Sequence, residues 1–421
     1  MFASGGQLNN IKLGGKYMKK VLSIILVGIM AMNLIACAGG SGKAATTTNE
    51  SGEKVIKIGV FEPQTGENGG GGIQEVYGIR YANSIYNTVN IGGEDYKIEL
   101  LEVDNKSDKT EAVNAAQKLI AEKVVAVLGS YGSGVSIAAG EYFKEGKTPA
   151  IGCSCTNPQV TNGNDYYFRT CFLDPFQGTV MASYAEKHGY NKVAVITQLG
   201  DDYSEGLGNF FVRACNEKGM EVVAQEKFQT NEQDFRAILT NIKNADPEFI
   251  FAPSSIATAP LILSQARELG ITCQIGAGDT WENGTIIENA HGAAEGMVVT
   301  TFYEANPSTA SGEEAIFLNG NGEGVTAKGF SNYLVNVEKQ SPDIPAVSAL
   351  GYDAYLAAYK AIEKAQSIEG PAVRDALASL QYEGVTGEIS FNDDGDANKD
   401  SAYVKEVENG KFVFKEKVGA N

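Results

Sequence analysis

Short hydrophobic runs alternate with longer amphipathic segments along this chain from residue 54 onward. The runs are rich in Val, Ile and Phe, which is typical of buried strands, and they lie at 54–61, 96–103, 124–129, 149–152 and 166–172. The same alternation begins again further on and predicts strands at 192–198, 221–228, 249–254, 274–278 and 296–303. Strands that alternate with helices in this way form parallel sheets covered by helices on both faces. The pattern therefore predicts an α/β protein with two doubly wound lobes.

The segments between these runs carry apolar residues at helical spacing. They predict helices that begin near Val76 and Ser133, and further helices at 107–122, 204–215, 235–242, 259–269 and 347–365. Gly69 to Gly72 predict a loop ahead of the first helix. Near the C-terminus, Asn409-Gly410 separates two β-rich runs and predicts a tight hairpin turn. Residues 313–329 show no clear periodicity, which predicts a surface excursion.

The N-terminal part of the chain predicts export. Met18 is followed by two lysines and by an apolar run at 21–35, a combination that is typical of a signal peptide. Cys37 follows Leu-Ile-Ala, which resembles the lipobox of bacterial lipoproteins and implies that the Cys37 thiol is lipidated. An ordinary signal peptide with a chance cysteine is the alternative. Residues 37–53 are rich in small and polar residues and predict a flexible tether.

Residues 1–17 precede the basic residues and fit no targeting signal. The codons for residues 14–17 can form a purine-rich ribosome-binding site just upstream of a start at Met18. We therefore interpret residues 1–36 as an untranslated prefix followed by the signal peptide.

Charge and residue inventory argue against several classes of function. The chain has 52 acidic and 34 basic residues and a formal net charge of −18, which disfavours binding to nucleic acid. It has only two histidines, His188 and His291, and no phosphate-binding loop, dinucleotide fingerprint or nucleophile elbow. We therefore expect no enzyme activity, no catalytic residue, no metal and no cofactor. A thiol amidohydrolase that uses Cys153 or Cys155 is the alternative.

The cysteines do not suggest a disulfide framework. Five remain after Cys37, an odd number for an exported chain. Cys153 and Cys155 are also too close in an extended segment to form an unstrained disulfide. Small buried hydrophobic residues are the simplest interpretation of all five.

Candidate binding residues follow the predicted strands, because ligands bind beyond the carboxyl ends of the strands in open α/β sheets. These places hold Ser130, Tyr131, Gly132, Ser133 and Gly134; Ser154, Cys155 and Thr156; Asp201, Asp202 and Tyr203; and Asp279. Hydroxyls and backbone amides at a helix start suit an anion, whereas a carboxylate suits an ammonium group. A zwitterion held between the two lobes would satisfy both.

Several motifs follow one another in the order found in a known family. They are Pro63-x-Thr65-Gly66, Gly129-Ser-Tyr-Gly-Ser133, Thr156-x-Pro158, Phe168-Arg-Thr170, Asp202-Tyr-Ser-Glu-Gly206, Gly278-Asp279 and Gly351-Tyr352-Asp-Ala354. From Val55 to Phe414 the chain resembles the Leu/Ile/Val-binding proteins of bacterial ABC importers, which have the type I periplasmic-binding fold. The resemblance implies lobe 1 at 54–172 and 302–391 and lobe 2 at 173–301 and 392–421, joined by hinge strands.

The resemblance also implies roles for individual residues. The hydroxyls of Ser133 and Thr156 would hold the α-carboxylate of an amino acid, with help from the backbone of Ser154. Tyr203 would supply an aromatic contact, and Asp279 would pair with the α-ammonium. The purely structural alternatives are helix capping for Ser154 and Thr156, core packing for Tyr203 and a surface turn for Asp279.

The ligand and its destination follow from the same resemblance. Where the family often has a bulky side chain over the ligand, this chain has Gly69 to Gly72, which predicts a roomier subsite with Tyr131 and Trp281 as candidate walls. We expect a branched-chain or similar aliphatic amino acid; a larger or polar amino acid or an amide is the alternative. The protein would be a monomer, lipid-anchored to the outer face of the cell membrane, that delivers its ligand to an ABC permease. Feeding a sensory receptor is the alternative role.

Overall fold

The structure of the chain, a computed structural model, describes residues 46–49, 51–304, 316–318 and 324–419. The predicted prefix, the signal peptide and Cys37 lie outside these residues. Strand β1 (Thr47–Thr48) falls within the predicted tether, but it pairs with the first long strand as an antiparallel neighbour. The C-terminal end of the tether is therefore part of the folded structure. None of the described helices combines the length and the apolar character needed to span a bilayer.

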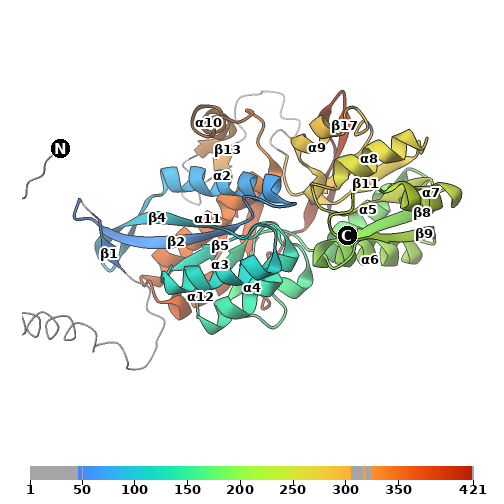
Figure 1. Cartoon of the computed structure of the whole chain (residues 1–421). Helices are drawn as coiled ribbons and strands as arrows, with labels where there is room; N and C mark the ends of the chain where they lie inside the picture. Colours follow the sequence, from blue (N-terminus) through green and yellow to red (C-terminus); the bar gives the residue numbers. More distant parts are fainter. Residues whose placement is uncertain (1–45, 50, 305–315, 319–323, 420–421) are drawn as a thin grey trace, which may run out of the picture. The chain divides into compact units, whose positions relative to one another are not determined.

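Lobe 1 is built on a sheet with the strand order β3-β4-β2-β5-β6-β7, and β1 lies beside β2 (Figure 1). Its strands are β2 (Lys54–Glu62), β3 (Thr88–Ile91), β4 (Glu94–Asp104), β5 (Ala126–Leu128), β6 (Ala150–Gly152) and β7 (Tyr167–Arg169). All neighbours from β4 to β7 are parallel, whereas β3 is antiparallel to β4. Helices α3 (Lys109–Ala121) and α4 (Ser133–Glu145) cover one face, and α2 (Gly69–Ile85) and α11 (Ala346–Ala365) cover the other.

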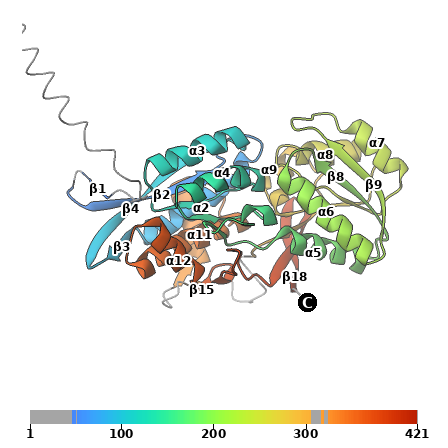
Figure 2. The ribbon, with the colours of Figure 1, turned by 90° about the horizontal axis from the view of Figure 1, so that it is seen from below.

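Lobe 2 is built on a second sheet, with the strand order β18-β17-β12-β11-β10-β8-β9. Its strands are β8 (Lys192–Gln198), β9 (Glu221–Phe228), β10 (Phe249–Phe251), β11 (Gln274–Ala277), β12 (Val298–Thr301), β17 (Ser401–Glu408) and β18 (Lys411–Gly419). The strands from β12 to β9 are parallel. Figure 2 shows helices on both faces of this sheet; the lobe contains α5 (Asp174–Lys187), α6 (Asp202–Glu217), α7 (Arg236–Asn244), α8 (Ala259–Glu268) and α9 (Gly284–Asn289). The predicted doubly wound α/β fold is confirmed.

The segments after β12 complete both lobes. The described part of the predicted excursion at 313–329 holds the antiparallel pair β13 (Ile316–Leu318) and β14 (Gly324–Thr326) and the start of α10 (Ala327–Tyr333). The remaining elements are the short helices η1 (Pro158–Val160), η2 (Asp279–Trp281) and η3 (Leu334–Glu338), the helix α12 (Gly370–Ala378), and the hairpin β15 (Gln381–Gly384) and β16 (Gly387–Ser390). The tight turn predicted at Asn409-Gly410 joins β17 to β18, and both residues have positive φ, +53° and +74°, as such turns require.

The glycine run at 69–72 forms the first turn of α2 and is not the predicted loop. Glycine is a poor helix former, which is why its composition suggested a loop. Its role is close packing, since a Cβ atom on Gly72 would lie 2.1 Å from the backbone oxygen of Pro63. Further along α2, a Cβ atom on Gly78 would lie 1.8 Å from the backbone oxygen of Ser348 in α11. These glycines allow α2 to approach its neighbours closely.

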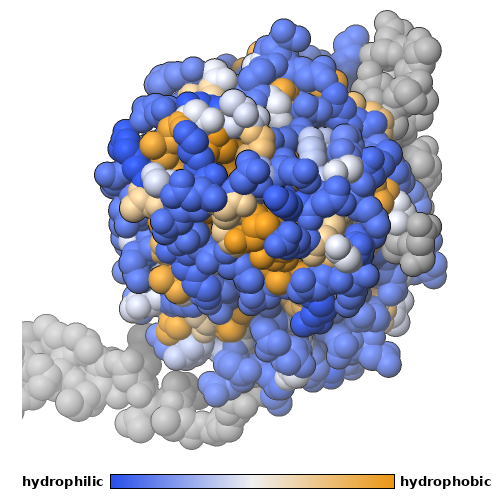
Figure 3. Space-filling model, turned by 90° about the vertical axis from the view of Figure 1, so that its right-hand side faces the viewer, coloured by the Kyte–Doolittle hydropathy of each residue, from blue (hydrophilic) through white to orange (hydrophobic). Residues whose placement is uncertain are grey.

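One face of the described surface is mainly polar. The face shown in Figure 3 is mainly hydrophilic, and hydrophobic residues form small separate patches on it. The large hydrophobic side chains that are exposed in the described part of the chain are Ile85, Val335, Val337 and Val413.

Candidate ligand-binding site

A small cavity lies between loops that follow strands of both sheets. Its lining comes from the segments after β2, β5 and β6 in lobe 1 and after β8, β10 and β11 in lobe 2. The lining residues are Asn68, Tyr131, Gly132, Ser133, Ser154, Asp201, Tyr203, Ser254, Ser255, Asp279 and Thr280. The cavity volume is about 10 Å³, which is close to the minimum that accommodates one water molecule. The two lobes are thus closed on each other at this site.

Lobe 1 supplies hydroxyl groups to the cavity wall. Ser133 is the first residue of α4, and its Oγ accepts a hydrogen bond of 3.0 Å from the backbone N–H of Asn157. That bond leaves the Ser133 hydroxyl hydrogen available to an acceptor. Thr156 is fully buried, and its Oγ1 makes no well-formed hydrogen bond within the described part of the chain. Ser133 lines the cavity with its hydroxyl hydrogen free and is therefore placed to donate to an anion, whereas Thr156 lies behind the lining, next to Asp174.

Arg169 holds the turn that carries Thr156. Its side chain is fully buried and forms an ion pair of 2.6 Å with Asp396. The same guanidinium donates hydrogen bonds of 2.7 Å to the backbone oxygens of Cys155 and Asn157 and of 2.7 Å to Thr161 Oγ1. Arg169 therefore fixes the backbone on both sides of Thr156.

Lobe 2 supplies a buried carboxylate. Asp279 begins η2 directly after β11, and only 2% of its surface is exposed. Its Oδ1 accepts hydrogen bonds from Gln177 Nε2 at 2.8 Å and from the Tyr203 hydroxyl at 3.1 Å. Burial raises the pKa of Asp279 to about 7, although both hydrogen bonds lower it. The structure thus rules out a surface turn for Asp279.

A second carboxylate, Asp174 at the start of α5, lies near Asp279. It is fully buried, and neither of its oxygens makes a well-formed hydrogen bond to a described residue. Burial raises its pKa well above the usual range; the nearby Thr156 hydroxyl lowers it and the charge of Asp279 raises it again. Among the described residues, no Lys or Arg forms an ion pair with Asp174 or Asp279. The positive charge of Arg169 lowers the pKa of Asp174, and Asp174 does not line the cavity, so Asp279 is the carboxylate placed to bind a cation.

Two buried carboxyl groups, those of Glu62 and Glu75, accept hydrogen bonds from the lobe-1 residues that line the cavity. Ser154 Oγ donates a hydrogen bond to Glu75, and the backbone N–H of Tyr131 donates one of 2.6 Å to Glu62. Single ligand atoms of Glu62, Glu75 and Cys153 lie within 4.8 Å of one another, a grouping that could hold a metal ion. Burial raises the pKa of Glu75 to about 7 and that of Glu62 well above its usual range. A proton shared by the two carboxyl groups accounts for this arrangement.

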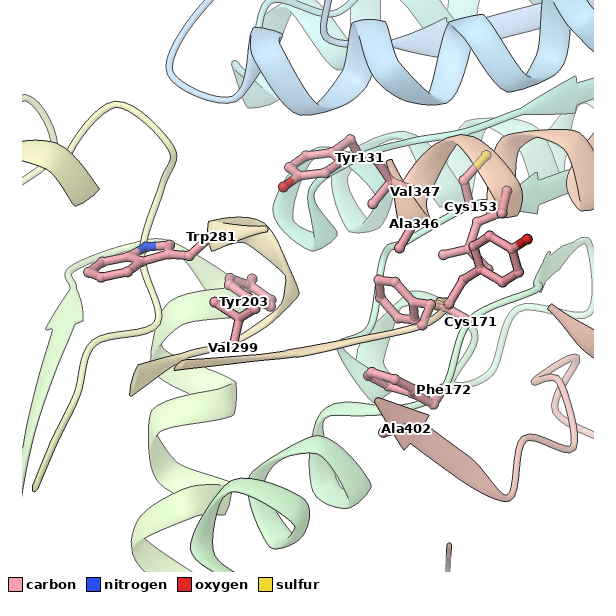
Figure 4. Close-up of a cluster of buried hydrophobic side chains, with 14 of the residues drawn as sticks. Tyr131, Cys153, Cys171, Phe172, Tyr203, Trp281, Val299, Ala346, Val347 and Ala402 are labelled. Atoms are coloured by element: carbon pink, nitrogen blue, oxygen red, sulfur yellow. The ribbon is translucent and has the colours of Figure 1, made fainter. Parts of the chain in front are cut away.

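Tyr131 fills the place where the glycine run predicted extra room. A Cβ atom on Gly71 would lie 2.3 Å from Cζ of the Tyr131 ring, so the ring packs directly on the backbone of α2. Figure 4 shows Tyr131 on one lobe and Tyr203 and Trp281 on the other. The Tyr131 hydroxyl donates a hydrogen bond of 3.3 Å to the backbone oxygen of Thr280. Trp281 is fully buried and does not line the cavity; its Nε1 donates to the backbone oxygen of Ser254 at 3.1 Å.

Comparison with known proteins places the chain in a family. The family model described as periplasmic binding protein matches residues 55–411. This chain belongs to the periplasmic binding protein family. The match spans both lobes and every loop that lines the cavity.

The similar proteins agree with this assignment. A leucine-binding protein, LivK, from Thermotoga maritima has a structure with a TM-score of 0.78 and 35% sequence identity, over 87% of this chain and 99% of that one. The transporter substrate-binding protein LivJ from Streptococcus pneumoniae, solved with isoleucine, has a TM-score of 0.74 and 30% identity, over 87% and 100%. The Leu/Ile/Val-binding protein homolog 1 of Brucella melitensis is 30% identical over 247 residues. That match covers 58% of this chain and 66% of the Brucella protein, just under two thirds of its length.

Most of the predicted site residues of this periplasmic binding protein meet at the cavity. Tyr131, Gly132, Ser133, Ser154, Tyr203 and Asp279 line it. Thr156 lies behind the lining, and the Cys155 side chain packs in the lobe-1 core near α4. All five described cysteines are free. Cys153, Cys155, Cys171 and Cys215 are buried, as predicted, whereas Cys273 is only partly buried.

Other residues at the site of this binding protein had not been singled out. Ser254 and Ser255 follow β10, and Thr280 follows β11. They therefore also fit the rule that ligands bind beyond the carboxyl ends of the strands, by which Ser133 was predicted. Asp174 and Gln177 are one helical turn apart at the start of α5. The spacing is their only signal in the sequence. It does not distinguish a binding site from an ordinary helix start, because helices commonly begin with polar residues of this kind.

Proposed function

We propose that this protein captures an α-amino acid between its lobes and delivers it to an ABC permease. The observation that carries the proposal is the placement, at one cavity, of the Ser133 hydroxyl from lobe 1 and the buried Asp279 carboxylate from lobe 2, which forms no ion pair among the described residues. An amino acid has a carboxylate and an ammonium group on one carbon atom, and it matches both walls. Charge-assisted hydrogen bonds of this kind contribute about 1.5–3 kcal/mol each.

Each group then has a specific role. The Ser133 and Thr156 hydroxyls donate to the α-carboxylate, and Asp279 accepts from the α-ammonium. Asp174 adds negative potential close to Asp279 and Thr156. Arg169 holds the backbone of the carboxylate-binding turn and does not itself contact the ligand.

Capture occurs by closure of the two lobes. We place the hinges where the chain passes between lobes, near residues 172, 301 and 391. Hydrogen bonds join the lobes, such as the bond of 3.0 Å from Gln198 Nε2 to Glu67 Oε2, and separation of the lobes would break them. A ligand that contacts both lobes stabilises the closed form because it binds the open form less well.

The relatives indicate which ligands to test first. The Thermotoga protein is named for leucine, and the Streptococcus protein was solved with isoleucine. Leucine and isoleucine are therefore the first amino acids to test, together with amino acids of similar shape that carry a polar side chain.

The test is a thermal-shift screen of the purified protein against the common L-amino acids. Ligands that bind the native state raise its melting temperature, so at least one amino acid should raise it in a concentration-dependent way. Recovery of that amino acid unchanged after incubation separates binding from turnover by Cys153 or Cys155. If no amino acid raises the melting temperature, the proposal is wrong.

The protein acts outside the cytoplasmic membrane, as a monomer held there by lipid on Cys37. The Cys37→Ser variant should leave the membrane fraction and appear in the soluble extracytoplasmic fraction. Unchanged membrane attachment of this variant would contradict the lipid anchor.

A further inference from the structure

One part of the cavity is not used by the α-amino and α-carboxylate groups. Its lining residues are Asn68, Asp201, Ser254 and Ser255. All four are polar, and none of the residues that line the cavity has an aliphatic side chain. The side chain of a bound amino acid must face this part of the wall, because Ser133 and Asp279 bind the other groups.

Hydrogen bonds link the segments that carry Asn68 and Ser255 across the two lobes. Asn68 Oδ1 accepts a hydrogen bond of 3.1 Å from the backbone N–H of Ile256. Gln198 bridges the same region, since its Oε1 accepts from the backbone N–H of Ser255 at 3.4 Å and its Nε2 donates to Glu67 at 3.0 Å. The wall therefore closes together with the lobes.

Asp201 has unused capacity to accept hydrogen bonds at this wall. It caps α6, and its Oδ1 accepts from the backbone N–H of Tyr203 at 3.2 Å. Its other oxygen makes no hydrogen bond or ion pair with any residue that the structure describes. The carboxylates of Glu67 and Asp202 raise the pKa of Asp201, and Lys109, which lowers it, is paired with Asp202 at 2.7 Å. Asp201 is partly exposed, and an aliphatic side chain would exclude water from this oxygen without offering it a hydrogen bond, which is unfavourable.

We propose that the side chain of the ligand carries an N–H or O–H donor that binds the free oxygen of Asp201. Asp201 is then the residue that determines specificity for a hydroxyl, amide or ammonium side chain. This inference rests on the proposed function, because it assumes that the α-amino and α-carboxylate groups occupy the rest of the cavity.

The test is isothermal titration calorimetry with pairs of amino acids of similar shape, one with a side-chain donor and one without. The pairs are threonine and valine, asparagine and leucine, and lysine and norleucine, which distinguish hydroxyl, amide and ammonium groups. In at least one pair the donor-bearing member should bind about tenfold or more tightly. Asp201→Asn should abolish most of that preference by weakening the donor-bearing member, and it should not weaken the aliphatic member.

Asp201→Asn retains the helix cap, since Asn caps helices as well as Asp does, and an unchanged melting temperature would verify that the variant folds. The matched control is Asp202→Asn, which removes the neighbouring carboxylate and should leave the ratio of affinities within each pair unchanged. If the aliphatic member binds at least as tightly in all three pairs, or if Asp201→Asn leaves the preference intact, the inference is wrong and amino-acid binding stands. If no amino acid binds at all, the proposed function is wrong, and the inference fails with it.

Discussion

The hydroxyl oxygen of Tyr131 lies 3.3 Å from the backbone oxygen of Thr280, and the hydrogen bond between them crosses from one lobe to the other. The Tyr131 ring also packs on Gly71 in α2, so this one side chain links a helix of lobe 1 to the loop that carries Asp279. Because the cavity beside it measures about 10 Å³, an amino acid can enter only when Tyr131 shifts or the lobes separate. Tyr131 thus couples the size of the site to closure.

This packing predicts a large effect for a small substitution. In Gly71→Ala the new Cβ would lie 2.3 Å from Cζ of Tyr131, and such overpacking costs about 1–3 kcal/mol of unfolding free energy. In a Tyr131→Ala background the same substitution should cost almost nothing, because the ring is gone. Urea unfolding of the original protein, of Gly71→Ala, of Tyr131→Ala and of the double variant gives the coupling energy between the two positions. Gly284→Ala is the control, since its Cβ would meet no atom within 4 Å; an equal cost at both glycines would contradict the proposed packing.

The ion pair of Arg169 and Asp396 should matter more for stability than the ion pairs on the surface. The exposed fractions of its side chains are 0% and 10%, and removal of one partner from a buried pair costs about 3–5 kcal/mol. We therefore expect Asp396→Asn to lower the unfolding free energy by about this amount. Ligand affinity should also fall, because the backbone around Thr156 loses its anchor. The control is Glu268→Gln, which breaks an exposed pair with Arg236; the exposed fractions of the two side chains are 57% and 50%. This variant should lose less than about 1 kcal/mol of unfolding free energy. Equal losses of unfolding free energy in the two variants would contradict this account.

Ligand stabilisation should depend on pH through Asp279. Burial raises the pKa of Asp279 to about 7 in the folded protein, whereas the pKa of an Asp in an unfolded chain is about 3.9. Between these values the folded protein without ligand holds a proton that the unfolded chain has lost, so its stability falls as the pH rises from about 4 to about 7. An ammonium ligand needs the ionised carboxylate and removes this penalty. The rise in melting temperature on ligand addition should therefore be larger at pH 8 than at pH 5.5.

The same pH experiment has an internal control. Asp279→Asn removes the titrating group, so the difference between the two pH values should shrink in this variant. Asp174 has a pKa raised in the same direction and should retain part of the effect. A ligand response that is larger at pH 5.5 than at pH 8 in the original protein would contradict the assignment of an ammonium partner to Asp279.

The sequence predicts the fold well because its signals are local. Alternating apolar runs and helical periodicity determine which segments pair as parallel strands, and the turn at Asn409-Gly410 depends on two adjacent residues. The start of α2 was predicted wrongly for a long-range reason. Gly71 packs against the ring of Tyr131, sixty residues further along the chain, and intrinsic propensity cannot include that contact.

Some residues of the site could be predicted from the sequence, and others depend on contacts between distant segments. Ser133, Ser154 and Asp279 follow strands, so topology alone brings them to one cavity. Asp174 reaches the site only because α5 packs beneath Asp279, and the buried pair of Glu62 and Glu75 depends on the packing of β2 against α2. No pattern of neighbouring residues carries this information.

The central claim, a cavity built for a zwitterion, is tested most directly by isothermal titration calorimetry with three forms of one ligand. These are the amino acid selected by the thermal-shift screen, the amine that lacks its carboxylate and the acid that lacks its ammonium group. Only the amino acid should bind tightly. Thr156→Val and Asp279→Asn should each weaken its binding about tenfold or more, whereas Thr179→Val, at an exposed helix position, should not. Equal affinity for either truncated form, or unchanged affinity in Asp279→Asn, would contradict the account.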